Sequence, residues 1–329
     1  MNANVTIIGA GSFGCSLAIS LAESNFFNVN IWGRFINTKI FNDRILQKFD
    51  VADPEIISNK ITISSNLSES LNFSKIIIIA LPSSCFLSFF NSIKSLIKED
   101  HIIVITSKGF ELNTGDFLDT FVSKILCSNN IAVMSGPMFS HEIAKLLPSA
   151  FVISSRNKSI IGDLVSFFNK NTLFNVTSSP DVKGVQLAGA MKNVIAIAAG
   201  LICNYGLNAR AALITNGFFE LKKLGLTLGC KEETFDLYSG LGDLVLTCTD
   251  NKSRNRATGV LLSQGYSVSE SLDKVECVVE GYYSAHYVYH LASEYNLDLT
   301  IINLVYDVLY RDVDRDKAIS RLVSYSCFT

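Results

Sequence analysis

Short apolar runs and longer helical periodicities alternate along the first half of the chain. The runs are mostly continuous in apolar character and are bounded by Gly, Pro, Asn or Ser, which is typical of parallel strands buried on both faces. They cover Val5–Ile8, Val29–Trp32, Ile61–Ser64, Ile76–Leu81, Ile102–Thr106 and Ile131–Met134. Phe13–Ser24 and Ser84–Leu96 have the spacing of amphipathic helices. This repetition predicts right-handed crossovers and a doubly wound α/β sheet.

From Pro180 onward the periodicity becomes helical. The predicted helices are Asp181–Leu201, Arg210–Leu224, Glu232–Tyr238, Arg254–Ser263, Tyr282–Glu294 and Ile301–Val308. We find no comparable strand run after about Phe151–Ser154, so we expect an all-helical C-terminal domain. Pro180 suits the first turn of a new helix. The pattern therefore predicts two domains, residues 1–180 and residues 181–329.

Composition supports a compact fold and limits the kinds of partner. The chain has 329 residues, of which 48% are hydrophobic and 18% charged. Such a chain is too apolar to stay disordered and is long enough for two cores. Its formal net charge of −2 gives no long-range attraction for nucleic acid. We expect no nucleic-acid partner, and any anionic ligand must be held by a local cluster of cations.

The sequence favours a cytoplasmic protein without a membrane span. Its richest apolar segment, residues 185–203, contains Gln186, Lys192 and Asn193, so it is not an uninterrupted spanning helix. The first predicted strand starts too close to Met1 to leave room for a secretory signal. The eight cysteines include no CxxC pair and fit buried thiols in a reducing compartment.

A glycine-rich loop follows the first predicted strand. Gly9, Gly11 and Gly14 form a G-x-G-x-x-G between that strand and a helix. The first glycine permits a tight turn, the second lets a pyrophosphate approach the backbone, and the third lets helix and strand pack closely. This context within a βαβ unit predicts a Rossmann-like, dinucleotide-binding N-terminal domain.

The end of the second predicted strand bears on the choice between NAD and NADP. An NAD-specific site usually has an acidic residue there, but none occurs between Glu23 and Asp43. The strand is followed by Arg34, whose guanidinium can pair with a 2′-phosphate. NADP, or use of both cofactors, is therefore favoured. The alternative is that Arg34 stacks on the adenine without selecting either cofactor.

A lysine lies within an apolar helix near the start of the second domain. The segment Gly184–Ile197 is small and apolar nearly all round, which predicts burial. Burial disfavours the ammonium of Lys192 and moves its pKa toward working pH, so this lysine can exchange a proton with a substrate oxygen. The alternative is a lysine whose long stem carries its charge to the surface.

Two further clusters supply matching chemistry. If Gly240–Cys248 opens a helix, Asp243 and Thr247 lie one turn apart and face the same ligand, or Lys192. Ser253, Arg254 and Asn255 precede an apolar helical pattern, so they form a first turn suited to phosphate. A helix cap and a solvated basic turn are the respective alternatives.

Residues at the predicted strand ends complete the candidate site. Lys108 and Gly136 each follow a strand, and carboxyl ends of strands face the ligand crevice in a doubly wound sheet. Lys108 as a plain loop charge is the alternative. Other chemistries lack their residues, since there is no Tyr-x-x-x-Lys, HExxH, GxSxG or P-loop motif. His286 and His290 have no carboxylate or thiolate nearby in sequence, so we expect no metal.

Taken together, these motifs resemble the bacterial-type glycerol-3-phosphate dehydrogenases that use NAD(P). The resemblance extends over nearly the whole chain. Its segments are GAGSFG, IWGR, SKGFE, SGPMFSHEIA, GVQLAGAMKNVIAIAAG, NARAALIT, SGLGDLVLTCTDNKSRNR and VEGY. It implies reversible reduction of dihydroxyacetone phosphate to sn-glycerol 3-phosphate with NADP or NAD, in a homodimer, supplying glycerol phosphate for phospholipid synthesis.

The resemblance also implies roles for individual residues. Lys192 is the proton donor and acceptor, with Asp243 and Thr247 beside it. Substrate contacts fall on Lys108, Gly136, Met138, Lys192, Asp243, Ser253, Arg254 and Asn255. Cofactor contacts fall on Gly9, Gly11, Ser12, Phe13, Gly14, Arg34, Lys108, Ser140, Arg254, Val278 and Glu280. Met138 departs from the family, which usually has Thr or Ser there, so only the backbone can make polar contacts at that position.

Two other functions fit parts of the pattern. One is a hydroxyacid or ketopantoate-type reductase of similar build, whose substrates lack a phosphate for the basic turn at Arg254. The other is a non-catalytic NADP-binding sensor, which has no need of Lys192 and Asp243.

Overall fold

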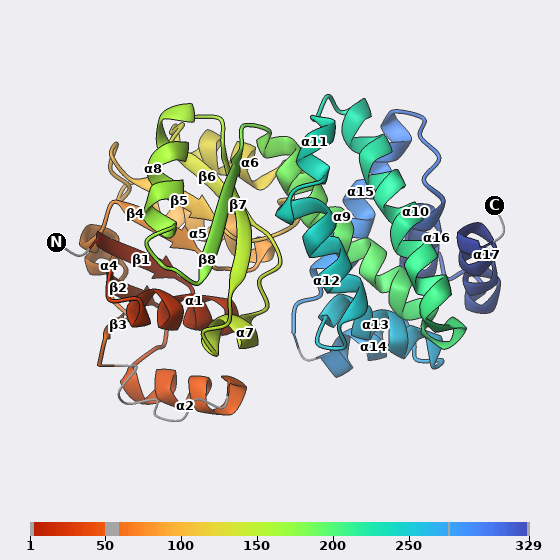
Figure 1. Cartoon of the computed structure of the whole chain (residues 1–329), viewed down its shortest axis with the longest axis horizontal. Coiled ribbons are helices and arrows are strands. Elements are labelled where there is room, and N and C mark those ends of the chain that lie inside the picture. The colour runs from red at the N-terminus through yellow and green to blue at the C-terminus, as the bar shows by residue number, and fades with distance from the viewer. Residues whose placement is uncertain (1–2, 50–58, 276, 328–329) are drawn as a thin grey trace. The chain divides into compact units, whose positions relative to one another are not determined.

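The computed structural model describes residues 3–49, 59–275 and 277–327. The chain folds as two compact units (Figure 1). The first, which we call the sheet unit, comprises Met1–Ser107 and Leu118–Val182; the second, the helical unit, comprises Lys108–Phe117 and Lys183–Thr329. The domains that we predict from the sequence, 1–180 and 181–329, differ from these units mainly in the 108–117 segment. That segment belongs to the helical unit although its neighbours in sequence belong to the sheet unit.

The sheet unit is built on an eight-stranded sheet with the order β3-β2-β1-β4-β5-β6-β7-β8. Its strands are β1 (Ala3–Ile8), β2 (Phe27–Trp32), β3 (Ile61–Ser64), β4 (Ile76–Ile79), β5 (Ile102–Ile105), β6 (Ile131–Ser135), β7 (Ser149–Ser155) and β8 (Phe174–Ser179). The central strands are almost wholly aliphatic and buried, as continuous apolar runs predict. The sequence therefore predicts every strand from β1 to β7.

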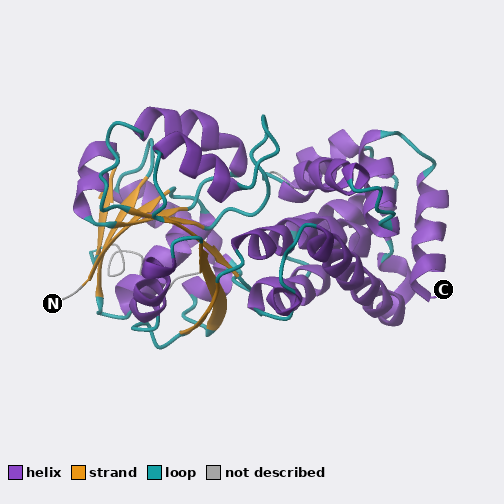
Figure 2. Cartoon of the chain, turned by 90° about the horizontal axis from the view of Figure 1, so that it is seen from above, coloured by secondary structure: helices purple, strands orange, loops and turns teal. Residues whose placement is uncertain are grey.

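Helices lie on both sides of these strands (Figure 2). They are α1 (Ser12–Glu23), α2 (Thr38–Phe49), α4 (Leu67–Phe73), α5 (Phe86–Ile93), α6 (Leu118–Leu126), α7 (Ser140–Ala144) and α8 (Lys158–Phe168), with a 3₁₀ turn at Ser83–Cys85. The Rossmann-like, doubly wound architecture predicted from the sequence is confirmed. It places the glycine loop between β1 and α1, and α1 packs against α2.

One sequence prediction about the sheet is wrong. A strand follows Phe151–Ser154 after all: β8 has the sequence FNVTSS, in which buried and more exposed positions partly alternate because it forms an edge of the sheet. Its polar residues hide it from a search for continuous apolar runs. The sheet is mostly parallel: β6 and β7 pair antiparallel, while the other neighbouring strands pair parallel.

The described part of the helical unit contains no strand beyond the isolated Phe110–Phe117 bridge. Its helical elements are α9 (Val182–Leu201), α10 (Gly206–Thr227), α11 (Glu232–Phe235), a π-helical turn (Tyr238–Gly242), α12 (Asp243–Thr249), α13 (Arg254–Ser263), α14 (Val268–Val275), α15 (Glu280–Glu294), α16 (Thr300–Tyr310) and α17 (Arg315–Cys327), with a 3₁₀ turn at Cys203–Tyr205. Most of the predicted helices form, and α14 and α17 are additions that the periodicity did not reveal.

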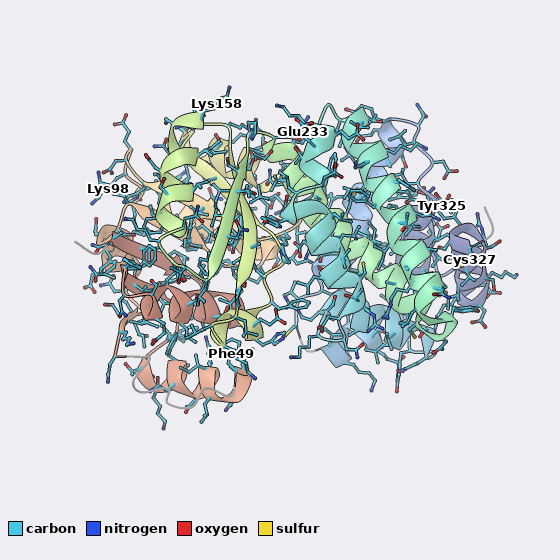
Figure 3. All side chains as sticks on the ribbon, in the orientation of Figure 1. Phe49, Lys98, Lys158, Glu233, Tyr325 and Cys327 are labelled. Atoms are coloured by element: carbon cyan, nitrogen blue, oxygen red, sulfur yellow. The ribbon has the colours of Figure 1, made fainter. Side chains whose placement is uncertain are left out.

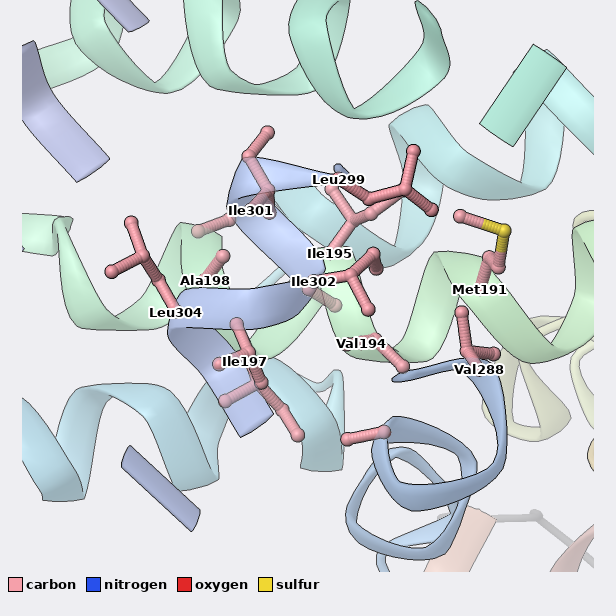
Figure 4. Packing of buried hydrophobic residues seen from close by; sticks show 14 of the residues in the cluster. Met191, Val194, Ile195, Ile197, Ala198, Val288, Leu299, Ile301, Ile302 and Leu304 are labelled. Carbon is pink, nitrogen blue, oxygen red and sulfur yellow. The ribbon is translucent and has the colours of Figure 1, made fainter. Parts of the chain in front are cut away.

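Helix α9 forms the core of the helical unit. Met191, Val194 and Ile195 belong to one apolar cluster with Ile301 and Ile302 of α16 (Figure 4). Among the described residues, α9 is the one helix long and apolar enough to cross a bilayer, and its apolar window is entirely buried inside the protein. A helix that is apolar on all sides is expected to be buried in this way, with other helices packed around it.

A close backbone approach fixes α13 against α9. A Cβ added to Gly200 would lie 2.2 Å from the carbonyl oxygen of Arg256, and one added to Gly259 would lie 2.0 Å from the carbonyl oxygen of Ile197. Any larger residue would force the two helices apart. The paired glycines therefore hold the first turn of α13, where Ser253 to Asn255 lie, in a fixed position relative to Lys192 on α9.

Candidate active site

Three side chains of the helical unit meet around the carboxylate of a fourth. Lys192 lies on α9, Asp243 and Thr247 lie one turn apart on α12, and Lys108 begins the 108–117 segment. The Lys192 Nζ is 2.5 Å from Asp243 Oδ1, and the Lys108 Nζ is 2.5 Å from Asp243 Oδ2. Each carboxylate oxygen thus accepts from a different lysine. The sequence pattern anticipated the one-turn spacing of Asp243 and Thr247, and the structure brings Lys192 and Lys108 to the same point.

Thr247 fixes the orientation of this group. Its hydroxyl donates to the Asp243 main-chain carbonyl at 2.6 Å and accepts from Lys192 Nζ at 2.8 Å. Because the hydroxyl proton is committed to the carbonyl, the oxygen lone pair faces the lysine. Lys192 therefore has a defined direction, with one bond to Asp243 and one to Thr247.

Burial sets the acidity of Lys192. The side chains of Lys192 and Asp243 are 7% and 2% exposed, so Lys192 does not carry its charge to the surface. Desolvation is the main cause that lowers the pKa of Lys192, to about 7; the charge of Lys108 lowers it further, and Asp243 opposes both effects. A lysine with a pKa near neutrality can both give and take a proton at working pH.

The 108–117 segment is tied to the helical unit by its own side chains. Phe110 is buried in the core of that unit, its ring between those of Phe117 and Tyr287. The Tyr287 hydroxyl donates to the Leu112 carbonyl. Glu111 accepts from the backbone and side chain of both Asn113 and Thr114, which closes the turn that follows. These contacts place Lys108 beside Asp243.

The first turn of α13 lies next to this cluster in the fold. Ser253 caps the helix by accepting from the backbone N–H of Arg256, and the Arg254 side chain is exposed. Asn255 donates to Asn193 Oδ1 at 2.8 Å and accepts from the Gly281 N–H at 2.9 Å. The sequence pattern did not reveal that Asn255 bridges α9, α13 and α15. This bridge leads directly to the start of α15, where Glu280 lies.

The glycine loop of the sheet unit has the geometry of a phosphate cradle. Gly9 adopts φ +114°, and a Cβ on Gly14 would lie 1.9 Å from the Gly9 carbonyl oxygen, so both positions require glycine. A Cβ on Gly11 would meet nothing within 4 Å. No protein contact requires glycine at Gly11, in contrast to Gly9 and Gly14. The missing side chain at Gly11 leaves open space beside the N-terminus of α1, where the helix dipole and the amide groups favour an anion.

A pocket of about 280 Å³ opens beside this loop. Its lining consists of Ala10, Gly11, Ser12, Cys15, Arg44, Lys48 and Phe49. Arg34 is exposed directly after β2 and is not among these residues. The sequence analysis missed the cations Arg44 and Lys48. It did not predict α2, so nothing indicated that these residues, four positions apart, lie on one face of a helix.

The remaining predicted contacts divide between the two units. Gly136 and Met138 belong to the sheet unit, where a Cβ on Gly136 would meet the Ala150 carbonyl oxygen at 2.4 Å and Met138 is buried among apolar side chains. Ser140 begins the short helix α7. Val278 and Glu280 belong to the helical unit, at the start of α15. In the described part of the chain, His, Cys, Asp and Glu form no group of three suited to a metal.

Comparison with protein families matches both halves of the chain. The family model described as "NAD-dependent glycerol-3-phosphate dehydrogenase N-terminus" matches residues 4–161. The model of the corresponding C-terminus matches residues 181–320. Together the two matches include Lys108, Lys192, Asp243 and Arg254.

Individual proteins agree with these matches. The chain is 41% identical to glycerol-3-phosphate dehydrogenase [NAD(P)+] of Serratia proteamaculans over 94% of this chain and 92% of that protein. It is 39% identical to the protein of the same name from Colwellia psychrerythraea, over 98% and 97%. The crystal structure of glycerol-3-phosphate dehydrogenase from Coxiella burnetii superposes with a TM-score of 0.85 at 31% identity, covering 98% and 99% of the two chains.

A ketopantoate reductase from Ralstonia eutropha also superposes, with a TM-score of 0.60 over 96% of this chain and 99% of that one. Its sequence is 14% identical, so the likeness concerns the fold alone. The family models and the relatives at about 40% identity match the sequence as well as the fold, and this distinguishes them from that neighbour.

Proposed function

The chain belongs to the NAD-dependent glycerol-3-phosphate dehydrogenase family, and from this premise we propose that Lys192 carries the proton in its reaction. It is an NAD(P)-dependent oxidoreductase that interconverts dihydroxyacetone phosphate and sn-glycerol 3-phosphate. Its reaction supplies glycerol phosphate for phospholipid synthesis. The observation that supports this role of Lys192 is the buried group of Lys192, Asp243, Thr247 and Lys108.

The proton moves between Lys192 and the oxygen on C2 of the substrate. When the ketone is reduced, the Lys192 ammonium donates a proton to the developing alkoxide and becomes a neutral amine. When the alcohol is oxidised, the neutral amine accepts the hydroxyl proton. A nicotinamide cofactor held at the glycine loop would supply the hydride in reduction and accept it in oxidation. A pKa of Lys192 near neutrality serves both directions, because neither protonation state is rare at working pH.

The neighbours of Lys192 orient it and balance charge. Asp243 holds Lys192 and Lys108 on separate oxygens, and Thr247 restricts the direction of the Lys192 Nζ. Lys108 is the more exposed of the two lysines, with 22% of its side chain accessible. We assign Lys108 to the substrate, where its positive charge polarises the oxygen that receives the proton.

The substrate phosphate requires cations and amide donors. We assign it to Ser253, Arg254 and Asn255 at the first turn of α13. Gly136 and Met138 of the sheet unit stay proposed substrate contacts through their backbone. The exposed Arg254 guanidinium and the amides of this turn favour a dianion. The Asn255 side chain is hydrogen-bonded to Asn193 and Gly281, so it also keeps this turn in place.

The glycine loop fits the cofactor. The open space at Gly11 and the neighbouring pocket leave room for a phosphate at the N-terminus of α1. We assign the cofactor to Gly9, Gly11, Ser12, Phe13, Gly14, Arg34, Lys108, Ser140, Arg254, Val278 and Glu280. Arg34 favours NADP, since a guanidinium after β2 suits a 2′-phosphate and an acidic residue is missing.

The assay that tests this function follows NADPH and NADH absorbance in the presence of candidate ketones. We expect oxidation with dihydroxyacetone phosphate and little with ketopantoate or unphosphorylated 2-keto acids. Faster turnover of ketopantoate would instead identify the related reductase. Binding of NADPH without turnover of any ketone would identify a non-catalytic sensor.

We further propose that the protein acts in the cytoplasm as a homodimer. The family resemblance suggests both, and the cysteines of the described residues form no disulfides, which fits a reducing compartment.

A further inference from the structure

Two cations on α2 lie against the glycine loop. Arg44 Nη1 donates to the Ala10 carbonyl at 2.6 Å, and Lys48 Nζ donates to Ser12 Oγ at 3.0 Å. The two residues are four positions apart, so they share one face of the helix. Helix α2 thus presents two positive charges to the turn that begins α1.

Both charges border the pocket beside this turn. Phe49, the last residue of α2, contributes to the pocket wall and is labelled in Figure 3. Among the described residues that line the pocket, none is acidic. Burial raises the pKa of the Cys15 thiol to about 12, so this group stays neutral at pH 7. The pocket therefore combines two cations with the positive end of a helix dipole.

Among the described residues, the hydrogen-bond partners of these two cations are neutral. Arg44 contacts a carbonyl oxygen and Lys48 a hydroxyl oxygen. A phosphate oxygen carries negative charge, so it attracts each of these cations more strongly than a neutral carbonyl or hydroxyl oxygen does. A phosphate entering the open space at Gly11 can therefore draw both side chains from their present partners.

We propose that Arg44 and Lys48 clamp a phosphate of the bound dinucleotide against the first turn of α1. This inference rests on the proposed function, because it takes NAD(P) as the ligand. The phosphate is either the pyrophosphate shared by both cofactors or the 2′-phosphate of NADPH. In both cases Arg44 and Lys48 act in addition to Arg34, which lies directly after β2.

Binding measurements with NADPH and NADH test the clamp without relying on turnover. The variants are Lys48→Met and Arg44→Met, with Lys48→Arg to retain the charge. Lys39→Met is the matched control, since Lys39 is an exposed lysine of the same helix that does not line the pocket. Dissociation constants are measured by nicotinamide fluorescence at two salt concentrations, and thermal melting confirms folding.

We expect Lys48→Met and Arg44→Met each to weaken binding by about tenfold or more, consistent with losing a charge-assisted hydrogen bond. Lys48→Arg and Lys39→Met should stay within about twofold of the wild type, on the scale where 1.4 kcal/mol is tenfold. Equal losses for both cofactors place the clamp on the pyrophosphate. A loss confined to NADPH places it on the 2′-phosphate.

Other results overturn the proposal. Unchanged affinity of Lys48→Met for both cofactors excludes a clamp, even where Arg44→Met fails to fold. An equal loss in Lys39→Met shows a general charge effect of α2 and also excludes it. If the folded wild type binds neither cofactor, the proposed function itself fails, which is a separate and recognisable outcome.

Discussion

The candidate site of the helical unit is a buried group of charged side chains around Asp243, whereas the candidate site of the sheet unit borders open space at Gly11. Around Asp243, two lysines and a threonine are held in a largely dry environment, and desolvation lowers the pKa of Lys192. Around Gly11, no other protein atom covers the side-chain face of the backbone, and the cations Arg44 and Lys48 of α2 are exposed. Burial changes acidity, which suits proton transfer, while exposed amides and cations suit the reversible capture of an anion.

This contrast assigns different consequences to mutation in the two units. In the helical unit, a substitution at the buried group should alter catalysis while cofactor binding persists. In the sheet unit, a substitution at the loop should alter cofactor binding, and only positions with close backbone contacts should also alter stability. Four variants, at Lys192, Gly11, Gly14 and Tyr287, test this separation, from the largest expected effect to the smallest.

Lys192→Met should cause the largest loss. Methionine keeps the length and apolar stem of lysine but cannot carry a proton, so kcat should fall by at least about 100-fold. NADPH affinity should remain that of the wild type. The matched control is Lys183→Met, an exposed lysine near the start of the same helix, which should keep normal kcat. Near-normal turnover of Lys192→Met would remove Lys192 from the mechanism.

Gly11→Ala and Gly14→Ala should separate binding from stability. A methyl group at Gly11 meets nothing in the protein, so the free energy of unfolding should change by less than about 1 kcal/mol. The same methyl projects where a phosphate approaches, and the cofactor dissociation constant should rise about tenfold. At Gly14 the methyl collides with the Gly9 carbonyl, so the melting temperature should fall. A stable Gly14→Ala with normal binding would contradict the account of the loop.

Tyr287→Phe should have the smallest effect. Losing the hydroxyl leaves the Leu112 carbonyl without its donor and loosens the 108–117 segment, so kcat should fall a few-fold. NADPH affinity should fall less than kcat, because Lys108 is one of many residues assigned to the cofactor. The charge of Lys108 lowers the pKa of Lys192, so a displaced Lys108 should move that pKa upward. Tyr283→Phe, an exposed position on the same helix, is the control. A loss of stability without any change in the pH profile would show that Tyr287 has only a structural role.

The fold was largely predictable because its main elements have strong periodicity. Continuous apolar runs marked the strands from β1 to β7, and the all-round apolar character of α9 predicted its burial. β8 was missed because an edge strand needs apolar residues on only part of its surface. α2 was missed because its apolar residues are few and widely spaced among polar ones.

The candidate site was less completely predictable. Motif spacing identified Lys192, Asp243, Thr247 and Lys108 as candidates, and the structure shows that they are in contact. Spacing could not show that Asn255 bridges three helices or that Tyr287 holds the 108–117 segment, because both depend on contacts between distant parts of the chain. The role of Arg44 and Lys48 could not be predicted without α2, because the position of this helix brings their side chains to the glycine loop.

The pH dependence of kcat/KM in both directions tests the central role of Lys192 most directly. Reduction requires the ammonium, so its rate should be level below the pKa of Lys192, about 7, and fall as pH rises above it. Oxidation requires the neutral amine, so its rate should fall as pH drops below the same value. Asp243→Asn should move both midpoints downward, because Asp243 raises that pKa. The predicted result is that kcat/KM falls with rising pH for reduction and rises with rising pH for oxidation, with one shared midpoint. The same pH dependence in both directions, or midpoints that Asp243→Asn leaves unmoved, would contradict the role of Lys192.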